Sequence, residues 1–347
     1  MRCRRRPGSF WCPSALTVKL VLGALIWLIA ITWLHHRLNQ QTSGQQVVRM
    51  GYMPVITNLA APLLDHLSKD SQDVHFQAVK FASFAEMAEA LRNDSIHAAF
   101  IIAPLAIVLR QQGVDVKVVL IGNRHESTLV ATKNRQAQRI EDLAGATVAV
   151  PMRYSGHYLL LRKMMEDKGL TEKIRLVEMN PPDMASALTS GALDAYFVGE
   201  PFAAQTVISE DADVVGYVES FWPGFICNLV LVKNDWLVSH LPVAQKMVET
   251  AARSGMWAKQ HPLEAATIAS GYWNQSVELV YHALTSPPER IVYGRFIPVS
   301  AELQKMADLM VRYELIEHAD IDGLVDARLA QAASMDAIHH LGSVLLP

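Results

Sequence analysis

Short apolar runs alternate with amphipathic stretches along most of the chain. The apolar runs of a first series are residues 47–52, 74–79, 98–102 and 116–121, and those of a second are 128–132, 148–150, 174–178, 195–198 and 214–217. Between them, apolar residues recur at helical spacing, for example over 59–68, 82–92, 105–111 and 158–168. Runs of this length predict buried strands, and the intervening pattern predicts helices. Strand and helix in strict alternation indicate an α/β fold with mostly parallel sheets covered by helices on both faces.

Two polar segments interrupt this alternation. Gly122–Ser127 separates the two series, and Phe221–Gly224 ends the second. One more apolar run, 225–232, follows, and from Asp235 onward the pattern is helical. We therefore predict two lobes that meet at a hinge. Lobe 1 takes 47–122 and 225–347, including a helical C-terminal tail, and lobe 2 takes 123–224.

A helix-start signature occurs twice in the second series. The run at 148–150 leads into Pro151–His157, and the run at 195–198 leads into Gly199–Phe202. Each loop aims a helix N-terminus at the end of its strand, where free N–H groups and the helix dipole favour an anion or polar ligand. Sites in open parallel sheets lie beyond the carboxyl ends of strands, so we expect a cleft between the lobes.

The N-terminal region carries a membrane signal. Arginines precede Leu20–Leu34, a run without charge, and Ala15–Leu34 reaches twenty residues if Lys19 snorkels. This predicts a basic cytoplasmic head at 1–14, a single-pass inner-membrane anchor at 15–34, a linker at 35–46 and a body in the periplasm. A cleaved signal peptide is the alternative, which would leave the body secreted into the periplasm.

Composition supports a large core and argues against nucleic acid as a partner. Apolar residues make up 51% of the 347 residues and charged residues 19%. The first nineteen residues hold five basic and no acidic side chains, so 26 basic and 34 acidic residues remain in the rest. Cys3 and Cys12 belong to the basic head, and Cys227 is predicted to be a buried core thiol without a disulfide partner.

The sequence holds no recognisable catalytic motif. Dinucleotide, phosphate-loop, zinc-protease and serine-hydrolase signatures are absent from it. The string His125-Glu126-Ser127 contains an acid, a base and a hydroxyl. In an extended strand, however, His125 and Ser127 share a face that Glu126 does not, so no triad is predicted. We expect a binding protein and no enzyme, without cofactor or metal.

Candidate ligand contacts gather at the predicted helix starts and crossings. They are Tyr52, Thr57, Asn58, Pro104, His125, Ser155, Gly156, His157, Glu200 and Trp222. For several of them a structural role is the alternative: Thr57, Asn58, Ser155 and Glu200 are also suited to helix capping, and Trp222 to packing at the hinge. Arg153 suits either an anion or the surface.

Several of these segments, in this order, resemble one protein family. They are Gly-Tyr-Met-Pro at 51–54, Ala-Ala-Phe-Ile-Ile-Ala-Pro at 98–104, Asn-Arg-His-Glu-Ser at 123–127, Val-Pro-Met-Arg-Tyr-Ser-Gly-His at 150–157, Asn-Pro-Pro-Asp-Met-Ala-Ser-Ala-Leu at 180–188 and Val-Gly-Glu-Pro-Phe-Ala-Ala-Gln at 198–205. The chain, over about residues 47–275, resembles the nitrate/sulfonate/bicarbonate substrate-binding proteins of ABC importers, a group that includes thiamine-pyrimidine-precursor binders. Its first loop, Pro54–Pro62, is longer than in nitrate and bicarbonate members, and Asn58 replaces an acid.

The resemblance implies a type II periplasmic binding fold that closes on a small solute and presents it to a permease and its ATPase. Calcium would be expected only with bicarbonate as the solute. A membrane-tethered sensor with the same fold, and an enzyme similar to pyrimidine-precursor synthases, are the alternatives. If Glu200 faces the cleft, the solute should carry a positive or hydrogen-donating group, and if it only caps its helix a plain oxyanion fits.

Overall fold

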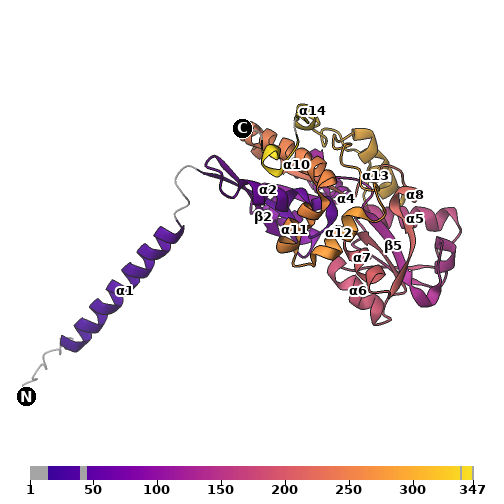
Figure 1. Cartoon of the computed structure of the whole chain (residues 1–347), viewed down its shortest axis with the longest axis horizontal. Helices are drawn as coiled ribbons and strands as arrows, with labels where there is room; N and C mark the ends of the chain where they lie inside the picture. The colour runs from indigo at the N-terminus through magenta and orange to yellow at the C-terminus, as the bar shows by residue number, and fades with distance from the viewer. Residues whose placement is uncertain (1–14, 40–44, 337, 346–347) are drawn as a thin grey trace, which may run out of the picture. The chain divides into compact units, whose positions relative to one another are not determined.

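The computed structural model describes residues 15–39, 45–336 and 338–345. Two compact units divide the chain, residues 1–45 and 46–347 (Figure 1). The basic head at 1–14, with Cys3 and Cys12, and residues 40–44 of the predicted linker at 35–46 lie outside the described residues.

The first unit contains one helix, α1 (Ala15–Asn39), within its described residues. Its large apolar side chains are exposed, with Leu16 at 68% and Trp27 at 70%. Among the described residues, no helix is both long enough and apolar enough to cross a membrane. The transmembrane anchor predicted at 15–34 is thus not supported by the structure.

The first sheet of residues 46–347 has five strands in the order β2-β1-β3-β10-β4. They are β1 (Gln46–Tyr52), β2 (Val74–Lys80), β3 (Ala98–Ile102), β4 (Val116–Ile121) and β10 (Asn228–Lys233). β1 runs parallel to β2 and β3, whereas β10 is antiparallel to both of its neighbours. Every residue of β3 is apolar and buried, as expected for a central strand covered on both faces. The helices α2 (Ala60–Ser68), α3 (Phe84–Arg92) and α4 (Ala103–Gln111) connect these strands.

The second sheet repeats this plan with the order β7-β6-β8-β5-β9. Its strands are β5 (Ser127–Thr132), β6 (Thr147–Val150), β7 (Arg175–Glu178), β8 (Ala195–Gly199) and β9 (Ala212–Tyr217), and β5 is antiparallel to β8 and β9. The helices α5 (Gly156–Asp167), α6 (Pro181–Thr189), α7 (Phe202–Ile208) and α8 (Val218–Phe221) accompany it. The predicted α/β class is confirmed. The chain passes from the first sheet to the second at 122–127 and returns to the first at 218–228. That the two parts move as separate lobes stays a prediction.

The C-terminal part consists mainly of helices: α9 (Asn234–Ser239), α10 (Leu241–Gln260), α11 (Pro262–Trp273), α12 (Val277–Thr285), α13 (Ser300–Arg312) and α14 (Arg328–Gln331). α10 and α11 lie beside α2 on the first sheet (Figure 1). α12 contacts α7, and α13 contacts both α4 and α5. The tail assigned to lobe 1 therefore also touches helices of the second sheet.

Arg124 fastens the crossing segment to this C-terminal part. Its side chain is only 1% exposed and donates to the carbonyl oxygens of Gly224, at 2.7 Å, and Arg295, at 3.0 Å. Both of its terminal nitrogens also reach the Glu302 carboxylate on α13, each at 2.9 Å. One guanidinium thus joins both crossings to α13.

We expect Arg124→Met to lower the free energy of unfolding by about 3 kcal/mol, because a buried carbonyl pair and a carboxylate lose their donor. Urea unfolding measures the loss. Arg295→Met is the matched control, because Arg295 pairs with the same carboxylate but is 58% exposed, and we expect it to change stability by less than about 0.5 kcal/mol. Equal losses in the two variants would contradict this role for Arg124.

Candidate functional site

Loops from both sheets converge on one buried region. The Ile56 N–H donates to the Glu200 carbonyl at 2.8 Å, and the Asn123 side-chain amide donates to the Ile56 carbonyl at 2.9 Å. Gly122 packs so closely that an added Cβ would lie 2.5 Å from the Thr57 carbonyl oxygen. We call the buried polar side chains gathered here the polar cluster: Thr57, Asn58, Asn123, Glu126, Ser127, His157, Glu200, Cys227 and Asn228.

Asn58 joins the first loop to the first sheet. Its side-chain amide donates to the Phe100 carbonyl at 3.1 Å, and its oxygen accepts from the Asn228 amide at 2.7 Å. Neither Asn58 nor Thr57 caps a helix, because the 3-10 turn Ile56–Asn58 and α2 both begin without a side-chain cap. The capping alternative is therefore wrong for both residues. The Thr57 hydroxyl makes no hydrogen bond of normal geometry, although it faces the Cys227 thiol.

His157 lies in the first turn of α5, in apolar surroundings. Its ring packs edge-on against Phe197 and is tilted against Phe225. Its Nε2 lies 2.9 Å from Ser127 Oγ, and its Nδ1 has no partner. Burial lowers the pKa of His157 to about 3, so the ring is neutral at physiological pH.

Two neighbours shape this helix start. Ser155 caps α5, since its hydroxyl oxygen accepts from the Tyr158 N–H at 3.2 Å and its proton goes to the Met152 carbonyl. The capping role that was one alternative for Ser155 is thus present in the structure. Gly156 packs against Phe225, whose ring would lie 2.7 Å from an added Cβ.

Glu126 is fully buried in the centre of the polar cluster. One carboxyl oxygen lies 3.0 Å from Ser127 Oγ, and the other accepts from the Glu200 N–H at 2.8 Å. Burial raises the pKa of Glu126 to about 7. A Cβ on Gly199 would lie 2.6 Å from this carboxyl group, so a larger residue there would displace the Glu126 side chain. Burial also raises the pKa of the Cys227 thiol, which therefore stays protonated, and the predicted buried core thiol is confirmed.

Glu200 has its partners inside the protein. Its carboxyl oxygens accept from the Thr128 hydroxyl at 2.6 Å and from the Ala204 N–H at 2.7 Å, and an Arg290 nitrogen lies 3.6 Å away. Burial raises the pKa of Glu200, and the charge of Arg290 opposes that rise. Arg290 also pairs with Glu219 and donates to the Ser127 carbonyl. Glu200 thus combines a capping bond to α7 with a buried ion pair.

Unpaired polar atoms mark the polar cluster. In the described part of the chain, five buried side-chain nitrogen or oxygen atoms lack a hydrogen-bond partner. Three of them are Thr57 Oγ1, Asn123 Oδ1 and His157 Nδ1, and the others are indole nitrogens of Trp257 and Trp273. Because burying an unpaired polar atom costs free energy, the presence of three such atoms in one cluster requires an explanation.

The remaining predicted residues lie around or away from the polar cluster. Pro104 is buried in the first turn of α4, next to Ala103, whose N–H donates to the Cys227 carbonyl. His125 joins the two crossings, because its Nε2 accepts from the Gly224 N–H at 2.7 Å. Tyr52 lies apart, in the core beside α11, with its hydroxyl donating to the Tyr272 carbonyl. Trp222 packs edge-on against Phe225 and lines a separate cavity.

Five further members of the polar cluster were not among the predicted contacts: Asn123, Glu126, Ser127, Cys227 and Asn228. The strand alternation expected over 125–127 does not occur, because β5 begins only at Ser127 and His125 has a left-handed φ of 70°. The side chains of Glu126 and Ser127 therefore meet. They form no catalytic triad, because Glu126 contacts the hydroxyl and does not orient His157. The sequence feature that could have identified these residues is the polar string at 122–127, which lies between the two series of apolar runs.

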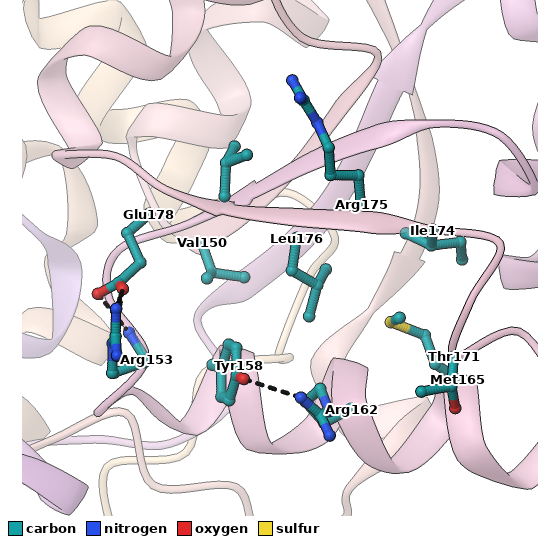
Figure 2. Close-up of a pocket in the computed structure, with 11 residues that line it drawn as sticks. Val150, Arg153, Tyr158, Arg162, Met165, Thr171, Ile174, Arg175, Leu176 and Glu178 are labelled. Atoms are coloured by element: carbon teal, nitrogen blue, oxygen red, sulfur yellow. Dashed lines mark hydrogen bonds and ion pairs between the residues drawn. The ribbon is translucent and has the colours of Figure 1, made fainter. Parts of the chain in front are cut away.

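Two surface cavities are lined by residues outside the polar cluster: the one beside Trp222 and a second one beside β7. One of about 460 Å³ lies between α5 and the edge strand β7 (Figure 2). In it Arg153 pairs with Glu178 and is 58% exposed, and Arg162 donates to the Tyr158 hydroxyl. The side chain of Arg175 points to the other side of the strand from Leu176 (Figure 2). None of the ten predicted contacts lines this cavity. No group of three or more potential metal ligands occurs among the described residues.

Comparison with known proteins agrees with this architecture. A sequence model of the NMT1-like family matches residues 41–271. A protein of Bacillus subtilis (strain 168) named for binding aliphatic sulfonates is 23% identical over 265 residues, which are 74% of this chain and 78% of that protein. The taurine-binding periplasmic protein of Escherichia coli (strain K12) is 24% identical over 192 residues, 52% of this chain and 59% of its own length. These matches confirm the predicted resemblance to sulfonate-type binding proteins.

Among solved structures, the periplasmic nitrate-binding protein NrtA from Synechocystis PCC 6803 superposes with a TM-score of 0.74 at 15% identity. The match covers 82% of this chain and 87% of that one. At this identity the likeness concerns the fold alone, and it shows that the α/β architecture with two sheets matches that of this neighbour.

Glu126 predicts a specific dependence of stability on pH. Its pKa is about 7 in the folded protein against 4.5 as an isolated group. The folded state therefore disfavours the carboxylate, and stability falls as pH rises from 4.5 to 7 and then stays level. We expect Glu126→Gln to show a smaller fall, because Glu200, whose pKa burial also raises, still contributes a fall of the same sign. The variant should be more stable than the wild type at pH 8 by up to about 3 kcal/mol. Urea unfolding between pH 4.5 and 8 measures it. Glu172→Gln, at an exposed site, should follow the wild-type profile, and an unchanged profile in Glu126→Gln would contradict the prediction.

Proposed function

The chain belongs to the NMT1-like family, and on that premise we propose that it is the extracytoplasmic solute-binding subunit of an ABC importer. It holds a small oxyanion of the sulfonate or nitrate class at the polar cluster and catalyses no reaction. Permease and ATPase subunits are its partners. The proposal applies to this chain what the names of its relatives say of them.

One observation carries the placement of the solute. Thr57, Asn123 and His157 each bury a polar atom that has no partner within the protein. They come from the loop after β1, the crossing before β5 and the start of α5, which belong to both sheets. An oxyanion between them could accept from the Thr57 hydroxyl and from one ring nitrogen of His157, and would contact both sheets at once. Asn123 Oδ1 is itself an acceptor, so only a solute that also donates, such as taurine, would pair with it.

The surroundings of Glu200 favour an oxyanion. Both carboxyl oxygens of Glu200 accept hydrogen bonds from the protein, and Arg290 offsets its charge. The solute therefore has no need to bring a cation or an amine to this position. The donors on offer are neutral: the Thr57 hydroxyl, one ring nitrogen of His157 and the N–H groups at the start of α5. Neutral donors suit a singly charged oxyanion that is otherwise enclosed.

Closure of two lobes is the mechanism that we propose. The Ile56–Glu200 hydrogen bond already links a loop of the first sheet with a loop of the second. A solute that bonds to both loops binds the closed arrangement better than an open one, so it shifts the population towards closure. The permease then recognises the closed form.

Export is the second part of the proposal. The apolar helix α1 follows arginines and exposes its large apolar side chains, a pattern suited to the export machinery. Either the segment is retained and anchors the body at the inner membrane, or it is cleaved as a signal peptide and the body is free in the periplasm.

Thr57→Val tests the solute site. The change removes an unpaired hydroxyl and keeps the side-chain shape, so stability should stay level or rise by up to about 1 kcal/mol. Affinity for methanesulfonate, taurine or nitrate, whichever stabilises the wild type, should fall at least tenfold, about 1.4 kcal/mol. Isothermal calorimetry on the full chain measures the affinity, and scattering should show compaction at saturation.

Thr206→Val is the matched control. The Thr206 hydroxyl is buried but paired with the Tyr196 hydroxyl at 2.6 Å. This variant should lose about 1 kcal/mol of stability and keep wild-type affinity. Equal affinity in Thr57→Val and the wild type would remove Thr57 from the site. If none of the three probes binds the wild type, the proposed solute class is wrong.

Export is tested with reporters fused after Gln46. We expect alkaline phosphatase, which is active only outside the cytoplasm, to be active in this fusion, and a cytoplasmic reporter to be inactive. N-terminal sequencing of the mature protein then separates the two forms: a start near Met1 indicates an anchor, and a start between His35 and Gln46 a signal peptide. A fusion active only in the cytoplasm would refute export.

A further inference from the structure

Three side chains of the polar cluster form a chain of hydrogen bonds that ends at the unpaired atom of His157. Glu126 Oε1 lies 3.0 Å from Ser127 Oγ, and Ser127 Oγ lies 2.9 Å from His157 Nε2. The far ring nitrogen, Nδ1, has no partner. The Ser127 hydroxyl has one proton, so it donates either to Glu126 or to His157 and accepts from the other.

The proton on Glu126 decides between the two directions. An ionised carboxylate only accepts, so Ser127 then donates to Glu126 and accepts from His157. In that state the His157 proton is on Nε2, and Nδ1 presents a lone pair. A protonated carboxyl group donates to Ser127, which in turn donates to His157 Nε2. The imidazole proton is then on Nδ1, which becomes a donor.

We propose that Glu126 is a positioning residue that sets, through Ser127, the tautomer of His157 and thereby makes Nδ1 either a donor for an oxyanion or an acceptor that repels it. The proposal rests on the proposed function, because it takes His157 as a solute contact. It adds to that function a dependence of solute class and affinity on the protonation of one buried carboxyl group.

The groups that face Glu126 act on its pKa in opposite directions, so both the protonated and the ionised carboxyl group are accessible near neutral pH. Burial raises its pKa and the nearby Glu200 adds to the rise, whereas Cys227, Ser127 and Arg290 lower it. The resulting pKa is about 7. Tyr293 faces the same carboxyl group and stays neutral, because burial raises its own pKa. The low pKa of His157 keeps its ring neutral, so only one ring nitrogen carries a proton in either state.

The hydrogen-bond geometry around Glu126 is compatible with either state. Its second oxygen accepts from the Glu200 N–H in both, so protonation needs no rearrangement of the backbone. Glutamine reproduces the protonated state, since its oxygen accepts from the Glu200 N–H and its amide donates to Ser127. Glu126→Gln therefore fixes the tautomer with Nδ1 as a donor.

The tautomer is measured first, without any solute. The full chain is labelled with ¹⁵N at histidine, and the His157 signals are assigned by their loss in His157→Gln. We expect the Nδ1–H tautomer at pH 6 and the Nε2–H tautomer at pH 8.5 in the wild type. Glu126→Gln should show Nδ1–H at both pH values, and Ser127→Ala should show no pH-dependent exchange of tautomer. A single tautomer of His157 at both pH values in the wild type overturns the proposal, whatever the variants do.

Affinity is the second readout, with methanesulfonate as an acceptor-only probe. We expect the wild type to bind it at least tenfold more weakly at pH 8.5 than at pH 6, and Glu126→Gln to change by less than twofold. A pH dependence retained in Glu126→Gln would overturn the role of Glu126. Failure of the proposed function looks different, because the tautomer would then change with pH while methanesulfonate binds at neither pH.

Discussion

The structure depends on one constraint: polar groups that are removed from water where the two sheets meet must find partners inside the protein. The chain satisfies it with pairs that are distant in sequence. Asn58 bonds to Asn228, and the carboxylates near Arg290 share its guanidinium. The exceptions are therefore informative. Three atoms left unpaired belong to the polar cluster, where we propose that the solute binds.

The same burial decides the protonation states within the polar cluster. Loss of hydration keeps the Cys227 thiol protonated and makes His157 a weak base, because its pKa is about 3. Ser127 contacts both Glu126 and His157, but Glu126 is not bonded to the imidazole. The direction of the hydrogen bonds along Glu126, Ser127 and His157 depends on where the protons of these groups are.

The two sheets have the same strand arrangement. In each, three adjacent strands are parallel, and the fourth, β10 or β5, is antiparallel and separates them from the edge strand β4 or β9. Their connection is more than two crossing segments, because α12 and α13 contact helices that belong to the second sheet. Arg124 ties both crossings to α13. Any closing motion must therefore carry these helices with it or slide along them, which restricts the directions in which the sheets can approach.

The sequence alone determined the features that rest on local pattern. Apolar runs of strand length and helical spacing gave the order of strands and helices, and the Ser155–His157 segment marked the start of α5, because periodicity and helix capping act over a few residues. The tertiary structure alone decided the partners. Asn58 and Asn228 are 170 residues apart and Arg290 and Thr128 are 162 apart, so no local signal relates them. It also decided the orientation of Glu126, because the left-handed backbone at His125 cancels the alternation of a strand and turns Glu126 towards Ser127.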